Sequence, residues 1–153
     1  MDLDIDSQSS KIYYQIGLDS ILKYYDSSEI MLHGELLQGD KKISYADYFF
    51  TATKNLKLQN PEIKLKVIKN SNGIPSTISM SCTKPALSVF IHATMPGTKS
   101  ELGLFLSDNY FTLFPNEKKE IKMNGFSSYK DFEIDKIKVY YKCLNTLTTS
   151  SSH

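Results

Sequence analysis

Three histidines and two cysteines are the residues of this sequence that are best suited to bind a metal or to act as nucleophiles. His33 and His92 each follow a run of apolar residues, and His153 is the last residue given. No two of these histidines have metal-ligand spacing, and neither Cys82 nor Cys143 has a partner two to four residues away. Both cysteines fall at apolar-face positions of strand-like segments, so we expect buried thiols, and a disulfide between two strands stays open. We therefore predict structural or surface histidines and no metal site.

Carboxylates are the second chemical possibility, because two of them are enough to hydrolyse a glycosidic bond. The Asp and Glu residues lie mostly in polar turns and on exposed strand faces. The densest cluster is Ser107-Asp108-Asn109-Tyr110-Phe111. Here Asp108 either binds sugar hydroxyls or forms a turn by accepting backbone N–H groups, and the turn is the favoured interpretation. The sequence has no Gly-rich phosphate loop and no Gly-x-Ser-x-Gly nucleophile motif, so we predict no catalytic residue and no cofactor.

Tyrosine pairs are candidates for stacking on sugar rings. They occur at Tyr13-Tyr14, Tyr24-Tyr25 and Tyr140-Tyr141. Because neighbours on a strand point to opposite faces, we expect one ring of each pair in the core and the other at the rim.

Composition excludes several classes of partner. The 153 residues include 18 Lys and no Arg, with a net charge of +1. Guanidinium groups dominate base readout and phosphate clamps, and these lysines are dispersed, so neither nucleic acid nor a membrane surface is an expected partner. No segment reaches the roughly 18 apolar residues of a membrane span. The acidic start, Met1 to Asp6, is unlike a secretory signal, so the sequence leaves the compartment unknown.

Apolar and polar residues alternate with period two over much of the sequence from residue 63 onward, which predicts strands with one buried face. Turn-forming residues separate these strands at Asn70–Gly73, Pro96-Gly97 and Pro115-Asn116. Six or seven short strands with such turns predict an all-β, immunoglobulin-like β-sandwich over residues 59–147. The strand-like segments are 63–67, 77–82, 87–91, 109–113, 120–123 and 136–143.

Residues 1–58 also contain strand-like segments, which make up about half of a sandwich. We therefore predict a partial second β-sandwich before the complete one, and a polar tail over the Thr-Ser run of 148–153. The expected strands are 11–16, 20–25, 29–37 and 43–51, with turns at 24–28 and 38–40.

Two motifs resemble segments of β-mannosidases, which belong to glycoside hydrolase family two. The run from Leu104 to Glu117 resembles the Phe-Ser-Asp-Asn-Tyr-Phe-Asp-Leu-Leu-Pro-Gly-Glu run of their C-terminal immunoglobulin-like domain, with Thr112 and Asn116 in place of the Asp and the Gly. The segment from 48 to 63 resembles the junction between their last two sandwiches, Phe-Phe followed by Lys-x-Leu-x-Leu-x-x-Pro. The matching residues are Phe49, Phe50, Lys54, Leu56, Leu58, Pro61, Ser107, Asp108, Asn109, Tyr110, Phe111, Pro115 and Glu117.

The resemblance implies that residues 1–58 are the later strands of a penultimate sandwich and that residues 59–147 are the C-terminal one. Catalysis in the family lies in a (β/α)₈ barrel, where two Glu cleave terminal β-mannosides with retention. No residue of that site has a counterpart here, and Glu117 falls in the Pro-Gly-Glu turn, so the chain itself is expected to be inactive.

The function implied is therefore that of a non-catalytic region which stabilises a multidomain β-mannosidase-like hydrolase. Its partners would be the preceding domains of that hydrolase, and its location would be lysosomal or secreted. Two alternatives stay open. One is a standalone module that binds carbohydrate such as a mannose-containing glycan, and the other is a module that binds a protein partner by strand addition at the edges of 1–58.

Overall fold

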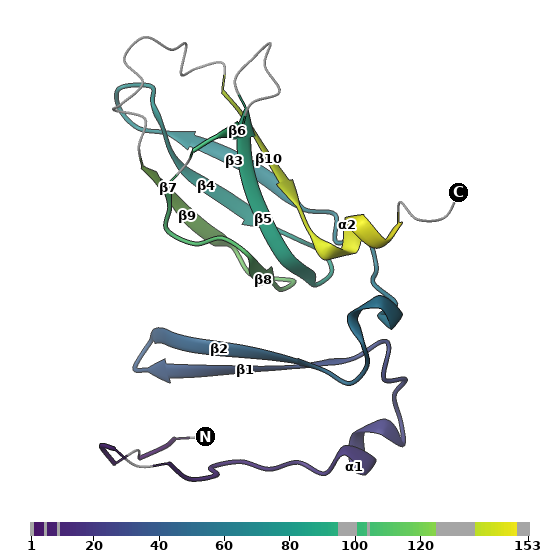
Figure 1. Cartoon of the computed structure of the whole chain (residues 1–153). Coiled ribbons are helices and arrows are strands. Elements are labelled where there is room, and N and C mark those ends of the chain that lie inside the picture. The colour runs from purple at the N-terminus through teal and green to yellow at the C-terminus, as the bar shows by residue number, and fades with distance from the viewer. Residues whose placement is uncertain are drawn as a thin grey trace. The chain divides into compact units, whose positions relative to one another are not determined.

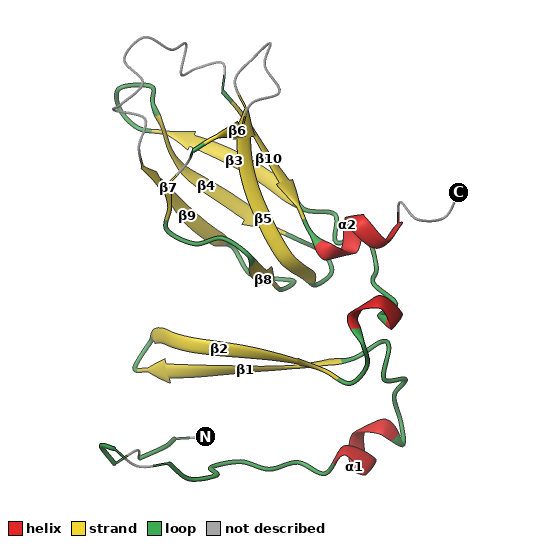
Figure 2. Ribbon diagram, viewed as in Figure 1, coloured by secondary structure: helices red, strands yellow, loops and turns green. Residues whose placement is uncertain are grey.

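The computed structural model describes residues 2–4, 6–8, 10–94, 101–103, 105–124 and 137–149. The chain divides into two compact units, Met1–Lys57 and Leu58–His153 (Figure 1). The boundary expected from the sequence lies one residue later. The protein is all-β, with antiparallel sheets and little helix (Figure 2).

The first unit is built around one β-hairpin. Its strands β1 (Met31–Gln38) and β2 (Lys41–Phe49) pair antiparallel, and Gly39 closes the turn between them at φ 57°. The remaining elements are the helix α1 (Leu18–Leu22) and the 3-10 helix η1 (Thr53–Asn55). The expected turn at 24–28 is present, because the Asp26 carboxylate accepts a hydrogen bond from the Ser28 backbone N–H at 2.9 Å.

Two of the four strands expected in the first unit do not form. Residues 11–16 have no ladder partner in the described part of the chain, and β-propensity alone makes no strand without one. Most of 20–25 lies in or just after α1, where Leu18 and Leu22 are one helical turn apart and Ser20 donates to the Gly17 carbonyl at 2.6 Å. Both rings of Tyr24-Tyr25 are exposed, so the expected division between core and rim is wrong for that pair.

The second unit is a sandwich of two four-stranded sheets (Figure 1). One sheet has the order β3-β4-β9-β7, and the other has the order β10-β5-β6, with β8 also paired to β5. The helix α2 follows the last strand. The elements are β3 (Lys64–Lys69), β4 (Pro75–Ser81), β5 (Ala86–Thr94), β6 (Glu101–Leu102), β7 (Phe105–Leu106), β8 (Phe111–Leu113), β9 (Lys119–Asn124), β10 (Lys138–Lys142) and α2 (Leu144–Thr149).

The core lies between the inner faces of these two sheets. The alternation of apolar and polar residues along each strand identifies the side chains that point into it. On β5, Leu87, Val89 and Ile91 are buried, as expected, while Phe90 is only half-buried. The two cysteines are buried and free, which confirms the expected thiols and leaves no disulfide. The main core cluster is Ile78, Met80, Cys82, Ala86, Val89, Ile91, Phe111, Leu113, Ile121, Met123 and Cys143.

Two of the expected turns of the sandwich are confirmed, and the third, Pro96-Gly97, lies outside the described residues. The Asn70 side chain accepts hydrogen bonds from the backbone N–H groups of Asn72 and Ile74, both at 3.0 Å, and Gly73 has a φ of 75°. Asn116 has a φ of 66°, a left-handed conformation that Asn tolerates better than most residues.

The end of the sandwich differs from the expectation. The helix α2 extends to Thr149, into the segment expected to be a polar tail, and residues 150–153 lie outside the described residues. The Thr146 hydroxyl donates to the Cys143 carbonyl at 2.9 Å at the start of this helix.

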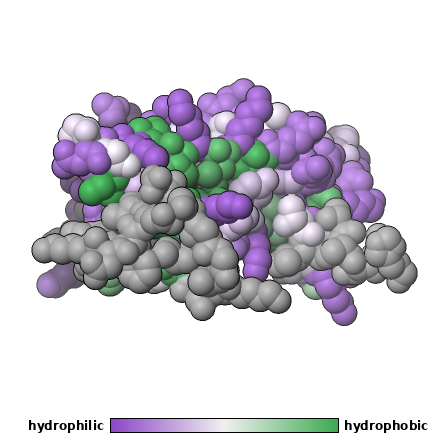
Figure 3. All heavy atoms as spheres, turned by 90° about the horizontal axis from the view of Figure 1, so that it is seen from above, coloured by the Kyte–Doolittle hydropathy of each residue, from purple (hydrophilic) through white to green (hydrophobic). Residues whose placement is uncertain are grey.

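Among the described residues, none of the helices has the length and apolar character that a membrane span requires. In the space-filling view, hydrophilic residues flank a band of hydrophobic ones on the visible face (Figure 3).

Candidate functional site

The segment from Ser107 to Phe111 carries the chain from one sheet to the other. Just before it, β7 pairs with β9, and at its end β8 pairs with β5. Ser107 anchors the first side, because its backbone N–H donates to the Lys122 carbonyl and its hydroxyl accepts from the Lys122 N–H, both at 2.9 Å. Phe111 anchors the other side, where its ring is fully buried in the core.

Asn109 extends the sheet with its side chain. Its Oδ1 accepts a hydrogen bond from the Ile91 N–H at 2.8 Å, and its Nδ2 donates to the Ile91 carbonyl at 3.1 Å. The amide therefore copies the pair of hydrogen bonds that a neighbouring strand would make with β5. The same Oδ1 also accepts from the Tyr110 N–H at 3.1 Å, which fixes the backbone one residue further on.

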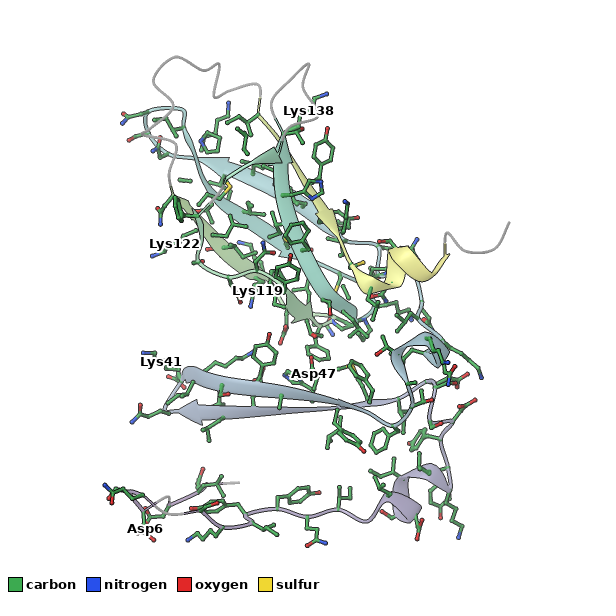
Figure 4. All side chains as sticks on the ribbon, viewed as in Figure 1. Asp6, Lys41, Asp47, Lys119, Lys122 and Lys138 are labelled. Atoms are coloured by element: carbon green, nitrogen blue, oxygen red, sulfur yellow. The ribbon has the colours of Figure 1, made fainter. Side chains whose placement is uncertain are left out.

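Asp108 is held by a lysine, and its carboxylate accepts no turn-forming backbone hydrogen bond among the described contacts. Its carboxylate forms an ion pair with Lys119 of β9 at 2.7 Å, and Lys119 also lies over the Phe111 ring, 4.4 Å from the centroid. Figure 4 labels Lys119 and Lys122, which both come from β9. The carboxylate is thus engaged within the protein, and this disfavours its use as a ligand for sugar hydroxyls.

Tyr110 holds a backbone conformation that is unusual for a bulky residue. Its φ is 60°, in the left-handed region, where an L-residue with a large side chain is strained. The side chain is 67% exposed, so its own burial does not account for the strain. Backbone strain of this kind is concentrated at functional sites, which makes the surroundings of Tyr110 the candidate site of this protein.

Four rings stack in a series on the outer face of β5 and β10, and we call them the aromatic row. The order is Tyr110, Phe90, His92 and Tyr140, with centroid distances of 4.8, 5.7 and 5.5 Å and interplanar angles of 24°, 13° and 22°. Phe90 and His92 alternate with the buried residues of β5, and His92 is the direct cross-strand partner of Tyr140. Near-parallel rings at these centroid distances stack with an offset, so each ring of the row shares one or both of its faces with a neighbour.

The two ends of the aromatic row are the most exposed rings. Tyr140 is 43% exposed, while its neighbour Tyr141 packs against the core, as expected for that pair. Within the row, the His92 Nδ1 is buried and has no hydrogen-bond partner among the described residues. The row is therefore a surface of stacked rings with exposed tyrosines at its ends and a half-buried histidine inside.

The second histidine in a strand, His33, is held by carboxylates of the hairpin. Its Nδ1 lies 2.6 Å from Asp47 Oδ1 across the strand pair, and its Nε2 lies 3.0 Å from Glu35 Oε1. Desolvation lowers the pKa of His33, but the hydrogen bonds to Asp47 and Glu35 outweigh it and leave the pKa raised. The hydrogen bond from His33, followed by that from Lys42, lowers the pKa of Glu35. No group of three metal-ligating side chains occurs among the residues that the structure describes.

The remaining motif residues serve turns and packing. Phe49 and Phe50 are half-buried at the end of the hairpin, Lys54 is exposed in η1, and Leu56 and Leu58 are half-buried. Pro61 is fully buried, and its carbonyl accepts from the Thr83 N–H at 3.0 Å.

Glu117 belongs to the turn that contains Pro115 and Asn116. Its N–H donates to the Phe114 carbonyl and its carboxylate accepts from the Phe114 N–H, both at 3.3 Å, so this residue closes the turn.

Asn145 is not among the residues predicted from the sequence, although it is the one buried polar residue among the described residues of the sandwich, only 2% exposed. Its Oδ1 accepts from the Leu87 N–H at 2.9 Å, and its Nδ2 donates to the carbonyls of Gln59 at 2.8 Å and Pro85 at 3.0 Å. A single asparagine near the end of a strand gives no sequence signal for such a role. Phe90 and His92 could have been found, because period two places them on one outer face.

The comparisons with known proteins concern mainly the sandwich. A family model for the immunoglobulin-fold domain of mannosidases matches residues 58–137, which is about half of the chain. No curated protein matches the chain. The matched residues contain the whole Ser107–Phe111 segment and three of the four rings of the aromatic row. The chain belongs to the family of mannosidase immunoglobulin-fold domains, the domain found in β-mannosidase-like glycoside hydrolases.

Proposed function

We propose that this chain is a non-catalytic β-sandwich region of a β-mannosidase-like glycoside hydrolase and that it stabilises the multidomain enzyme that hydrolyses terminal β-D-mannose. The observation that carries the proposal is the family match over residues 58–137. The roles of the motif residues support it. Ser107, Asn109, Phe111 and Glu117 each build the sandwich, and Asp108 is held in an ion pair with Lys119.

The hairpin of the first unit supports the proposed partner, the other domains of the parent hydrolase. A two-stranded sheet is marginally stable by itself, and large apolar side chains on a surface mark a site of packing. The hairpin exposes such side chains on both strands, with Leu37 at 55% as the most exposed. The exposed set is Leu32, Leu36, Leu37, Ile43, Tyr45 and Tyr48.

Two measurements test the proposal. The purified chain, incubated with an aryl β-D-mannoside, is expected to release no aryl product, and sustained release that follows the protein through purification would overturn the non-catalytic role. An immunoblot of the source cells with an antibody against this chain is expected to show a band on the order of 100 kDa, the size of a barrel and several sandwich domains. A band near 17.4 kDa alone would overturn the role within a larger hydrolase.

A mannose-containing glycan is the second candidate partner, and the exposed rings of Tyr110 and Tyr140 are the observation that supports it. Two features favour it less than the packing role. The rings of the aromatic row stack with one another, and Asp108 is engaged by Lys119. Titration with mannohexaose is expected to leave the amide signals of residues 90–94 and 138–142 unchanged.

A further inference from the structure

The strand β10 lies at the edge of its sheet. Its ladder to β5 runs from Lys138↔Thr94 to Lys142↔Phe90, and its other side has no ladder partner within the described ranges. Figure 1 shows this strand along the outside of the sandwich. The open backbone N–H and C=O groups of an edge strand are a template for another extended chain.

The outer face beside this edge is positively charged. Lys138 and Lys142 are both exposed there, on either side of Tyr140, and Figure 4 labels Lys138 at the beginning of the strand. Neither β5 nor β10 contains an acidic residue along its described length. The edges of aromatic rings also carry partial positive charge, so the aromatic row adds to the field of the two lysines. The complementary ligand carries carboxylates.

The stacking of the rings favours a polypeptide over a sugar. A sugar ring stacks on a free face of an aromatic ring, and Phe90 and His92 each already stack with two neighbouring rings of the row. An added strand uses the backbone edge of β10, which has no partner among the described residues, and contacts the exposed Tyr140 beside it.

We propose that the free edge of β10, together with Tyr140, Lys138 and Lys142, docks an extended acidic segment of another protein as an added strand. Residues four apart on one strand share a face and lie about 13 Å apart, as do Lys138 and Lys142. The docked segment therefore carries two Asp or Glu residues four positions apart, which meet the two lysines. An apolar residue midway between them lies beside Tyr140. This proposal does not depend on the role in a hydrolase.

Lysines at a sheet edge also discourage pairing with neutral or basic chains. The edge strand β3 of the other sheet also carries a pair of exposed lysines, Lys64 and Lys66. β3 has no stacked rings beside these lysines among the described contacts, so it provides a matched control within the same unit.

The test is an NMR titration of the ¹⁵N-labelled full chain with the capped peptide Ser-Glu-Thr-Val-Thr-Glu-Ser. We expect saturable shifts at residues 138–142 and 90–94 with a Kd on the order of 1 mM. The Kd should rise at least about fivefold in a Lys138→Gln, Lys142→Gln double variant and in 0.5 M salt, which screens the charges. The Lys64→Gln, Lys66→Gln double variant has the same net charge and should keep the original Kd, and the peptide with Lys in place of Glu should not bind.

Several outcomes would overturn the proposal. One is the absence of saturable shifts at peptide concentrations of several millimolar. Another is an equal loss of binding in the Lys64/Lys66 variant, which would show that any lysine pair suffices. A third is saturable shifts at the same residues with mannohexaose but not with the peptide, which would assign the surface to a glycan. Tyr140→Ala should weaken the peptide complex, whereas Phe105→Ala, at another exposed ring, should not.

Discussion

The side-chain amide of Asn109 pairs with both backbone groups of Ile91, at 2.8 Å to the N–H and 3.1 Å from the carbonyl. A side chain thereby continues the pairing of β8 with β5 one step beyond its last ladder pair, Val89↔Phe111. The crossing between the two sheets depends on this pair, because it fixes Ser107–Tyr110 against β5.

Replacing Asn109 tests this pair directly. Asn109→Ala leaves the N–H and the carbonyl of Ile91 without their partners, and we expect the free energy of unfolding to fall by about 2–4 kcal/mol. Urea denaturation measures the change. Asn72→Ala, in an exposed turn, is the control and should stay within about 0.5 kcal/mol of the unmodified chain. A loss of similar size in both variants would contradict the role of Asn109.

The left-handed backbone of Tyr110 gives a prediction about two substitutions of the same residue. Tyr110→Asn and Tyr110→Ala both lose the stacking on Phe90, but Asn tolerates a φ of 60° far better than Ala. We expect the Asn variant to be more stable than the Ala variant by about 0.5–1 kcal/mol. Urea denaturation of the pair decides the matter, and an equal or reversed order would show that the strain is absent.

The buried amide of Asn145 predicts a large effect of a small change. Asn145→Ala removes the partners of the Leu87 N–H and of the Gln59 and Pro85 carbonyls, so we expect unfolding to become easier by about 2–4 kcal/mol. Thermal unfolding measures this. An effect below about 0.5 kcal/mol, the usual size for a surface site, would mean that water replaces all three bonds.

The cluster of His33, Asp47 and Glu35 makes the hairpin sensitive to pH. The pKa of His33 is raised above its usual 6.5 by the two carboxylates, so its contribution to hairpin stability is complete below about pH 6.5 and is lost as the pH rises through the raised pKa. Amide exchange of β1 and β2, corrected for the intrinsic rate, should show easier opening above neutral pH.

The variant His33→Gln provides the control for this pH dependence. It removes the titrating ring, so the opening free energy of the hairpin should no longer change across neutral pH. Glu35 and Lys42, which form an ion pair beside the ring, remain in that variant. The same pH dependence in both proteins would assign the effect to another group.

The two free thiols should be protected in the native state. The Cys82 Sγ donates to the Leu113 carbonyl at 3.4 Å, and burial raises the pKa of Cys82, so the reactive thiolate is scarce. Labelling of Cys82 and Cys143 by a thiol reagent should be at least about tenfold slower in buffer than in denaturant. Rapid labelling of either residue in buffer would place it near the surface.

The sandwich is well predicted from the sequence because its strands and turns are marked by residues within each short segment. Period two identifies the inward-facing residues of β4, β5, β9 and β10, and one asparagine or glycine is enough to mark a turn. The first unit shows where this information ends. Residues 11–16 are rich in Tyr and Ile, yet a strand also needs a partner, and the partner cannot be read from the segment itself.

The candidate site is less visible in the sequence for a related reason. Tyr140 and Tyr110 were singled out, but the aromatic row also requires that His92 lie opposite Tyr140. That register is set by the packing of the whole sheet and by its bulges, so composition and spacing do not contain it. Asp108 likewise looked like a turn former, because its partner Lys119 is eleven positions away on another strand.

Asn145 joins the beginning of the sandwich to its end, since its Nδ2 reaches the Gln59 carbonyl at 2.8 Å. The first and the last segments of this domain are therefore held together by one side chain. A short peptide linker would be enough to connect these two ends of the domain. New chain termini could be placed at the Asn70–Gly73 turn without cutting a strand. The same anchor makes the domain suited to circular permutation, with Asn145 still pulling the old termini together in the rearranged chain.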